Sequence, residues 1–171
     1  TSSSSAELVG ICGGLQMLGT AITDPAGVES GGLAARPLDL LPLATEMAVD
    51  KVLCQAAARF VPTGEDVCGY EIHHGQTHVT DGRIRPVMTR ADGTVIGWGR
   101  ADGLVWGTYL HGVFDADIFR RSFLDRLRVR KGLAPLGRVQ VVYDLEAALD
   151  RLAGVVRSSV DMPRIYGLLG L

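Results

Sequence analysis

The stretch that decides the fold runs from residue 7 to residue 22 and reads ELVGICGGLQMLGTAI. Its start, from Glu7 to Ile11, is short, contains β-branched residues and is bounded by glycine, which predicts a buried strand. The residues from Leu15 to Ile22 include good helix formers and end before an Asp-Pro pair, which predicts a short helix. A buried strand that runs directly into a helix is the building unit of α/β domains, so we expect a fold of that class.

Further along the chain, the pattern changes to strands separated by tight turns. Residues 24–68 are interrupted by glycine and proline and are expected to form loops with one or two strands, one of them around 51–54. Four later apolar runs predict strands, and the Asp-Gly pairs that begin at 81, 92 and 102 predict the turns between them. The four runs are 70–74, 84–89, 95–98 and 104–110.

Two amphipathic helices are expected to close the chain. The first is predicted to be capped by Asp115 and to end at Gly132, with a core stripe formed by Ile118, Phe119, Phe123 and Leu127. The second is expected over about 144–156, with an apolar side formed by Leu145, Leu149, Leu152 and Val156. The order of elements predicts one α/β domain over residues 1–171, with a mixed sheet flanked by helices. Only one strand precedes the helix after Cys12, so the N-terminal part of such a fold is expected to be lacking.

The composition is that of a globular protein and excludes several function classes. The chain has 171 residues, of which 47% are hydrophobic and 21% charged, and this excludes extended disorder. A net charge of -2 argues against a nucleic-acid partner, because phosphate contacts need a surplus of Lys and Arg. No apolar run reaches the roughly 18–20 residues of a membrane span, and the polar start at 1–5 lacks the order of a secretory signal. Three widely spaced cysteines indicate a reducing compartment, so a cytoplasmic protein is expected.

The sharpest chemical signal is the pattern Gly-x-Cys-x-Gly at residues 10–14. A nucleophile at a strand end before a helix sits on a sharp turn, and the flanking glycines let the chain turn and the substrate approach. Cys12 is therefore a candidate nucleophile, with the Gly13 N–H facing a developing oxyanion and the helix N-terminus lowering the pKa of the thiol. The alternative is a buried structural cysteine beside a glycine turn.

The histidines offer a base for this thiol. His111 follows an apolar run and is flanked by glycine, and strand ends of this kind carry the sites of α/β folds. It could equally be a hydrogen-bonded histidine at a turn. A second group follows Cys68 and contains His73, His74 and His78, but its spacing matches no standard zinc signature. No metal site is therefore expected, and no phosphate-loop sequence occurs in the chain.

Three segments together resemble a known family. They read GICGGLQMLG at 10–19, GYEIHHGQT at 69–77 and GTYLHGVF at 107–114. In this order they resemble the C-terminal, class I (triad-type) glutamine amidotransferase domain of cobyric acid synthases. The resemblance implies a flavodoxin-like domain that hydrolyses L-glutamine to glutamate and ammonia. It also implies that the ammonia serves ATP-dependent amidation of cobyrinic acid diamide carboxylates to cobyric acid, in cobalamin biosynthesis.

The resemblance further implies roles for individual residues. Cys12 would form a γ-glutamyl thioester, His111 would act as general base and acid, and Gly13 would supply an oxyanion-hole N–H. Gln16 would help to hold the glutamine. A segment expected close to the substrate contributes Tyr70, Glu71 and His73.

Two departures from the family pattern affect these expectations. Triad amidotransferases carry His-x-Glu, whereas the third position here is Val113, a lack that cobyric acid synthases share. The group that orients His111 is then a backbone carbonyl or another carboxylate such as Glu71. The synthetase domain is absent from the sequence, so ATP, Mg²⁺ and the corrinoid substrate are expected on that partner domain of the same protein, with no cofactor in this chain.

Other functions stay open at this point. A non-catalytic interaction or regulatory domain could keep the same fold. The domain could also serve a related cobyrinic acid a,c-diamide synthase, or a relative that amidates cell-wall lipid precursors. The run from Gln16 to Gly19 and the segment 70–74 favour cobyric acid synthase.

Overall fold

The computed structural model of the chain describes residues 6–171, so the polar start at 1–5 lies outside the described residues. The chain divides after Val139 into two compact units, and each is described by itself. The single domain expected over 1–171 stays a prediction.

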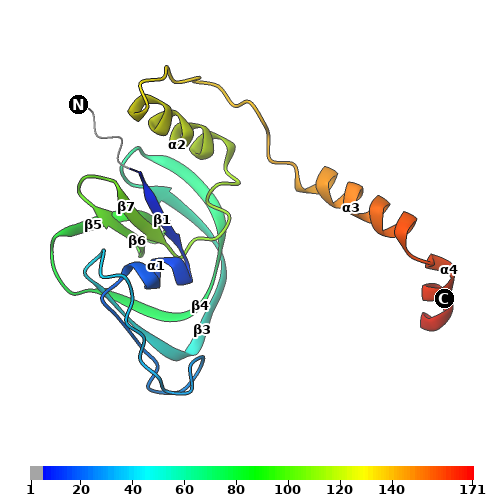
Figure 1. The fold of residues 1–171 in the computed structure, drawn as a ribbon, viewed down its shortest axis with the longest axis horizontal. Helices are drawn as coiled ribbons and strands as arrows, with labels where there is room; N and C mark the ends of the chain where they lie inside the picture. The colour runs from blue at the N-terminus through cyan, green and yellow to red at the C-terminus, as the bar shows by residue number, and fades with distance from the viewer. Residues whose placement is uncertain (1–5) are drawn as a thin grey trace. The chain divides into compact units, whose positions relative to one another are not determined.

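The first unit is built on one mixed sheet (Figure 1). Its described strands lie in the order β1-β7-β6-β5-β3-β2, with β4 paired to β3. The pairs β1–β7 and β2–β3 are parallel, and the others are antiparallel. The strands are β1 (Leu8–Ile11), β2 (Ala21–Thr23), β3 (Leu43–Phe60), β4 (Glu65–Val79), β5 (Ile84–Arg90), β6 (Val95–Arg100) and β7 (Val105–Thr108).

A helix covers each face of this sheet. The helices are α1 (Gly13–Leu18) and α2 (Asp117–Arg130). Val105 packs with Leu15 of α1, whereas its neighbour Trp106 packs with Phe119 of α2. Successive side chains of a strand point to opposite faces, so the two helices lie on opposite sides of β7. The expected mixed sheet flanked by helices is confirmed.

The segment that decides the fold differs from expectation in one detail. The predicted strand from Glu7 to Ile11 is confirmed as β1, but the helix ends at Leu18 and the chain re-enters the sheet as β2. Gly19 sits at this point, where a Cβ would lie 2.6 Å from the carbonyl oxygen of Leu43. Since Thr20 N–H donates to the same carbonyl at 2.7 Å, close contact with β3 ends the helix.

The largest error of the sequence analysis concerns residues 43–60. Loops with a short strand around 51–54 were expected, whereas the structure has β3 over Leu43–Phe60, paired along most of its length with β4. The buried positions near its end are Ala56, Ala58 and Phe60. Small alanines give only a weak alternating hydrophobic signal, so the long strand was not recognised.

Helix α2 is present where it was predicted, but its N-cap and one residue of its core stripe differ from the prediction. Its N-cap is Ala116 and not Asp115, and Asp117 in the first turn pairs instead with Arg120. Ile118 is 72% exposed and does not belong to the core stripe, whereas Phe119 is fully buried. Gly132 follows the helix with a φ of 72°, so the predicted stop is confirmed.

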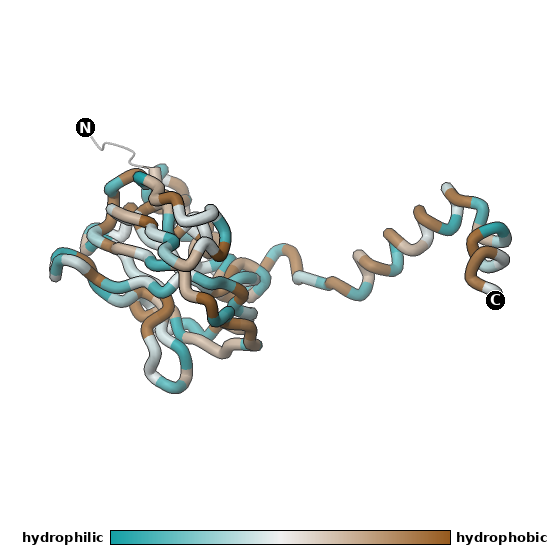
Figure 2. Tube along the Cα trace, turned by 90° about the horizontal axis from the view of Figure 1, so that it is seen from below, coloured by the Kyte–Doolittle hydropathy of each residue, from teal (hydrophilic) through white to brown (hydrophobic). Residues whose placement is uncertain are grey.

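The second unit consists of α3 (Leu145–Ser159) and α4 (Met162–Leu169). Asp144 caps α3 by accepting a hydrogen bond from the N–H of Ala147 at 3.0 Å, close to the predicted start. The four residues of the predicted apolar side all lie in α3, and their side chains are 45% to 58% exposed. Figure 2 shows apolar and polar stretches recurring along this helix. None of the helices in the described part of the chain is long and apolar enough to cross a membrane.

Candidate active site

Cys12 occupies a strained turn between β1 and α1. Its φ is 53° and its ψ is −112°, in a region that L-residues other than glycine rarely adopt. Gly10 makes the turn possible, because a Cβ there would lie 2.5 Å from the carbonyl oxygen of Gly14. Beside Cys12, a Cβ on Gly13 or Gly14 would meet no atom within 4 Å, so space is open next to the thiol. The predicted sharp turn at Cys12, between a strand and a helix, is confirmed.

The environment of the Cys12 thiol does not lower its pKa as predicted. Burial raises the pKa, the backbone N–H of Gly13 opposes this, and the negative charge of Glu29 adds to the increase. Helix α1 has only six residues, and its N-terminus does not outweigh the burial. The thiol is therefore the dominant form at neutral pH, and a nucleophilic role needs a base.

His111 lies just beyond the end of β7, the strand next to β1. Its backbone pairs with Tyr70 of β4 through two hydrogen bonds, of 2.8 Å from its own N–H and 3.3 Å to its carbonyl. Its imidazole stacks on the ring of Tyr70, with centroids 4.9 Å apart. Its Nε2 atom is buried and has no hydrogen-bond partner among the described residues. A buried nitrogen without a partner is available for a proton transfer or a ligand.

Both Cys12 and His111 contact the same short stretch of β4. Cys12 Sγ lies 3.6 Å from the carbonyl oxygen of Ile72, whereas His111 pairs with Tyr70 two positions earlier. Two residues of a strand span roughly 7 Å, so the thiol and the imidazole converge on one region. Cys12 is also anchored to β7, since its N–H donates to the Thr108 carbonyl at 2.8 Å. The structure thus places both predicted catalytic residues beside the same stretch of β4.

Neither of the expected carboxylate positions orients His111. Val113 stands at the third position of the His-x-Glu pattern, is 1% exposed and belongs to the hydrophobic core. The carboxylate of Glu71, considered above as an orienting group, instead contacts His73 Nε2 at 3.2 Å and Arg90 at 3.3 Å. That suggestion for Glu71 was wrong. The imidazole of His111 instead stacks on the ring of Tyr70.

The other predicted substrate-binding residues form two groups. Tyr70 is 45% exposed and lies next to His111. Glu71 and His73 are buried, and their polar atoms contact each other, Arg90 and the carbonyl of Gly75. Glu71 and His73 are therefore buried beneath the surface that a substrate would contact, whereas Tyr70 lies at that surface.

Gln16 of α1 is buried beside a group of hydroxyls that the sequence analysis did not identify. Its Nε2 donates to the Tyr109 hydroxyl at 3.4 Å. The same hydroxyl lies 2.5 Å from Thr77 Oγ1, which is 2.7 Å from Thr45 Oγ1. The spacing of two between His73, Gly75 and Thr77 is the signal that could have placed these residues on one face of a strand.

The zinc alternative finds no support in the described part of the chain. No group of three His, Cys, Asp or Glu residues there could hold a metal ion. Both ring nitrogens of His73 have partners, His74 contacts the Ala48 carbonyl at 3.0 Å, and Cys68 is exposed.

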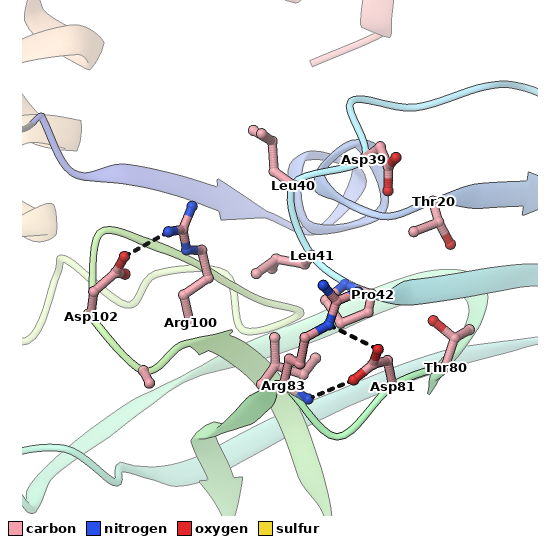
Figure 3. A pocket seen from close by; sticks show the side chains of 12 residues that line it. Thr20, Asp39, Leu40, Leu41, Pro42, Thr80, Asp81, Arg83, Arg100 and Asp102 are labelled. Carbon is pink, nitrogen blue, oxygen red and sulfur yellow. Dashed lines mark hydrogen bonds and ion pairs between the residues drawn. The ribbon is translucent and has the colours of Figure 1, made fainter.

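A cleft of 720 Å³ lies elsewhere, where the loop before β3 meets two turns (Figure 3). Its charged lining consists of paired groups, Arg83 with Asp81 and Arg100 with Asp102, together with Asp39. Neither Cys12 nor His111 lines this cleft. The cleft is therefore not the place of the predicted chemistry.

The fold and the site together define a class. A mixed α/β sheet carries a strained cysteine at the end of one strand and a histidine just past its parallel neighbour. This is the arrangement of α/β domains with a nucleophile elbow.

Comparison with known proteins identifies the family within that class. The chain belongs to the CobB/CobQ-like glutamine amidotransferase domain family, whose sequence profile matches residues 1–119. It is 48% identical to a cobyric acid synthase of Nitratidesulfovibrio vulgaris over 96% of this chain and 36% of that protein. It is 46% identical to the adenosylcobalamin biosynthesis bifunctional protein CobDQ of Leptospira interrogans, over 96% of this chain and 19% of that protein.

The coverage shows how much of its relatives the chain represents. A cobyric acid synthase of Moorella thermoacetica is 36% identical over 96% of this chain and 34% of its own length. The chain thus spans about a third or less of the curated relatives it matches. A solved glutamine amidotransferase structure aligns with 12% identity and a TM-score of 0.49 over 74% of this chain and 61% of that one.

Proposed function

We propose that this chain hydrolyses L-glutamine to glutamate and ammonia through a thioester on Cys12. The observation that carries the proposal is the convergence of the strained Cys12 and the unpartnered Nε2 of His111 on one stretch of β4. Membership in a glutamine amidotransferase family supports glutamine as the substrate.

The chemistry follows from the protonation state of the thiol. Because burial keeps Cys12 protonated, His111 accepts the thiol proton as the sulfur attacks the side-chain carbonyl carbon of glutamine. The C–N bond then breaks, and His111 returns the proton to the nitrogen, which leaves as ammonia. Water, deprotonated by His111, attacks the thioester, releases glutamate and restores the thiol.

The backbone beside Cys12 would stabilise the charge that develops on the substrate oxygen. The N–H of Gly13 already acts on the Cys12 sulfur, and the open space at Gly13 and Gly14 leaves room for the substrate carbonyl. A fixed backbone donor of this kind stabilises an oxyanion without reorganisation. Gln16 would hold the glutamine, and the exposed face of Tyr70 would border it.

The ammonia would be used by a synthetase domain of the same protein. The relatives named cobyric acid synthase are about three times as long as this chain, which supports a partner domain of that kind. There, ATP and Mg²⁺ would activate carboxylates of a cobyrinic acid diamide for amidation to cobyric acid, in cobalamin biosynthesis in the cytoplasm. The chain itself would need neither ATP nor Mg²⁺.

Intact-mass labelling tests the proposal directly. The purified chain is treated with the diazoketone analogue of L-glutamine, beside Cys12→Ser and His111→Ala variants, and ammonia release from glutamine is measured in parallel. A single adduct that is lost in Cys12→Ser and slowed in His111→Ala is the expected result. Unselective labelling of all three proteins, without ammonia release, would reject the glutaminase assignment.

Two observations favour a second candidate function. The raised pKa of Cys12 and the buried Val113 are also compatible with a domain that binds without catalysis. Such a domain would give no adduct in the labelling experiment. The related alternative, an a,c-diamide synthase, would share the adduct and differ only in the corrinoid that the complete protein amidates.

A further inference from the structure

Three hydroxyl groups form a cluster under helix α1, in which Thr45 and Tyr109 are buried and Thr77 is partly buried. Thr45 of β3 and Thr77 of β4 are paired in register, and their Oγ1 atoms lie 2.7 Å apart. The hydroxyl of Tyr109, just after β7, lies 2.5 Å from Thr77 Oγ1. Tyr109 is 3% exposed. A buried hydroxyl costs free energy unless it is hydrogen-bonded, and these three hydroxyls satisfy one another.

The cluster supports the side-chain amide of Gln16. Burial raises the pKa of Tyr109, so the phenol keeps its proton and can donate one hydrogen bond while it accepts another. Gln16 Nε2 donates to this oxygen at 3.4 Å. Because Nε2 is engaged by the cluster, Oε1 on the other branch of the amide is the atom left to bind a ligand.

The ring that carries the hydroxyl is itself fixed. The imidazole of His73 stacks on Tyr109 with centroids 3.8 Å apart and an interplanar angle of 18°. His73 is held in turn by Glu71 at 3.2 Å and by the Gly75 carbonyl at 2.8 Å. Arg90 completes the series with a 3.3 Å contact to Glu71.

Gly75 provides the space in which the amide lies. A Cβ at this position would lie 2.3 Å from Gln16 Nε2 and 2.8 Å from the Tyr109 hydroxyl. The φ of Gly75 lies outside the left-handed region, so an alanine there meets no backbone strain. The absent Cβ therefore serves the close approach of the amide and not a turn.

We infer that Tyr109, supported by Thr45 and Thr77, is a positioning residue that fixes the Gln16 amide with its carbonyl oxygen turned toward the substrate. The inference rests on the proposed glutaminase function. In that position the oxygen accepts a hydrogen bond from a cationic donor, and the α-ammonium group of L-glutamine is such a donor. The hydroxyl cluster thus contributes to the preference for an α-amino acid amide over a simple amide.

Two electrophiles separate this role from a structural one. The diazoketone analogue of L-glutamine carries the α-ammonium group, whereas iodoacetamide is a simple amide electrophile without it. Second-order rates of Cys12 modification by each reagent are measured by peptide mapping, because the exposed thiol of Cys68 also reacts with iodoacetamide. The variants are Tyr109→Phe, which removes only the hydroxyl, and Gly75→Ala, with Tyr166→Phe on α4 as the matched control.

The expected result is a loss of selectivity. Tyr109→Phe lowers the rate with the diazoketone by about tenfold, the effect of one hydrogen bond that orients a charged partner. Gly75→Ala lowers that rate at least as much, while iodoacetamide modifies both variants within about twofold of the original rate. Ammonia release from glutamine then shows a raised KM with kcat less affected.

Other outcomes would overturn the inference. An unchanged diazoketone rate in Tyr109→Phe would reject the role of the hydroxyl and leave the glutaminase proposal standing. An equal fall with both reagents would assign Tyr109 a purely structural role. If the original chain showed no preference for the diazoketone, the proposed function would fail and the inference with it.

Discussion

The imidazole of His111 lies flat on the phenol ring of Tyr70, with ring centroids 4.9 Å apart and an interplanar angle of 6°. Their backbones are also paired through two hydrogen bonds. The position where a triad enzyme would carry a glutamate holds the buried Val113 instead. In triad enzymes a carboxylate limits the orientations of the imidazole by hydrogen bonding. Here the stacked ring of Tyr70 limits them.

Replacement of Tyr70 tests this role. Tyr70→Ala removes the stacked ring, so we expect kcat for ammonia release to fall about tenfold, since a histidine base depends on its geometry. Tyr70→Phe keeps the ring and should stay within about twofold. Tyr70 is 45% exposed, so the thermal midpoint of unfolding should change little in either variant. Equal activity of the alanine and phenylalanine variants would contradict the stacking argument.

Gly69 supports the same pairing from the backbone. A Cβ on residue 69 would overlap the carbonyl oxygen of His111. Gly69→Ala should therefore separate β4 from residue 111, lower the free energy of unfolding by about 1–3 kcal/mol and abolish most of the ammonia release. Urea denaturation measures the first effect. Gly82→Ala is the control, because its Cβ would meet no atom within 4 Å and should leave both quantities unchanged.

The site was predictable where local pattern carries the chemistry. The glycines around Cys12 dictate a sharp turn in any context, and the structure shows it as a positive φ at that residue. The position of His111 beyond an apolar strand followed from the same kind of local pattern. The mixed α/β architecture followed from the order of strand, helix and strands.

What the sequence could not give depends on contacts between distant segments. Burial and Glu29 raise the pKa of Cys12, and neither is visible in the Gly-x-Cys-x-Gly pattern. The partners of Glu71 come from two strands, and the hydroxyl cluster joins β3, β4 and the chain after β7. Such groupings exist only once the register of β3 on β4 is known.

The raised pKa of Cys12 makes a prediction about pH. The rate of iodoacetamide modification of Cys12 should follow thiolate formation, with a midpoint above the value of about 8.5 for an ordinary thiol. Because Glu29 contributes by its negative charge, Glu29→Gln should move the midpoint down. Peptide mapping over a pH series measures both. An unmoved midpoint in Glu29→Gln would show that the charge of Glu29 does not contribute to the pKa of Cys12.

The raised pKa of Cys12 also affects how the stability of the protein depends on pH. The folded state holds the Cys12 proton more tightly than the unfolded state, so its contribution to stability is fully present below the unfolded pKa. That contribution is lost as the pH rises through the folded pKa. Cys12→Ser has no titrating thiol. The difference in the free energy of unfolding between the original chain and Cys12→Ser should therefore narrow or change sign as the pH rises through the pKa of Cys12. Denaturant titrations at several alkaline pH values measure it.

The carboxylate of Asp24 fixes the backbone of the loop that carries Glu29. Its carboxylate accepts hydrogen bonds from the N–H groups of Val28, Glu29 and Ser30 at 2.7 to 2.9 Å, and these bonds hold its pKa well below the ordinary range. A lowered carboxyl pKa stabilises the loop above the unfolded pKa of about 3.9, and this support is lost as the pH falls through the folded value. Asp24→Asn replaces one accepting oxygen by a donor, so the loop should open at neutral pH.

Hydrogen exchange measures that opening residue by residue. In Asp24→Asn we expect the amides of residues 28–30 to exchange at least about tenfold faster, since each loses a charge-assisted acceptor. Asp150→Asn on the exposed side of α3 is the control and should leave these amides unchanged. Because a mobile loop no longer holds the Glu29 charge near the thiol, Asp24→Asn should also reproduce the fall in the Cys12 pKa expected for Glu29→Gln. Faster exchange without that fall would mean that Glu29 acts on Cys12 independently of the loop.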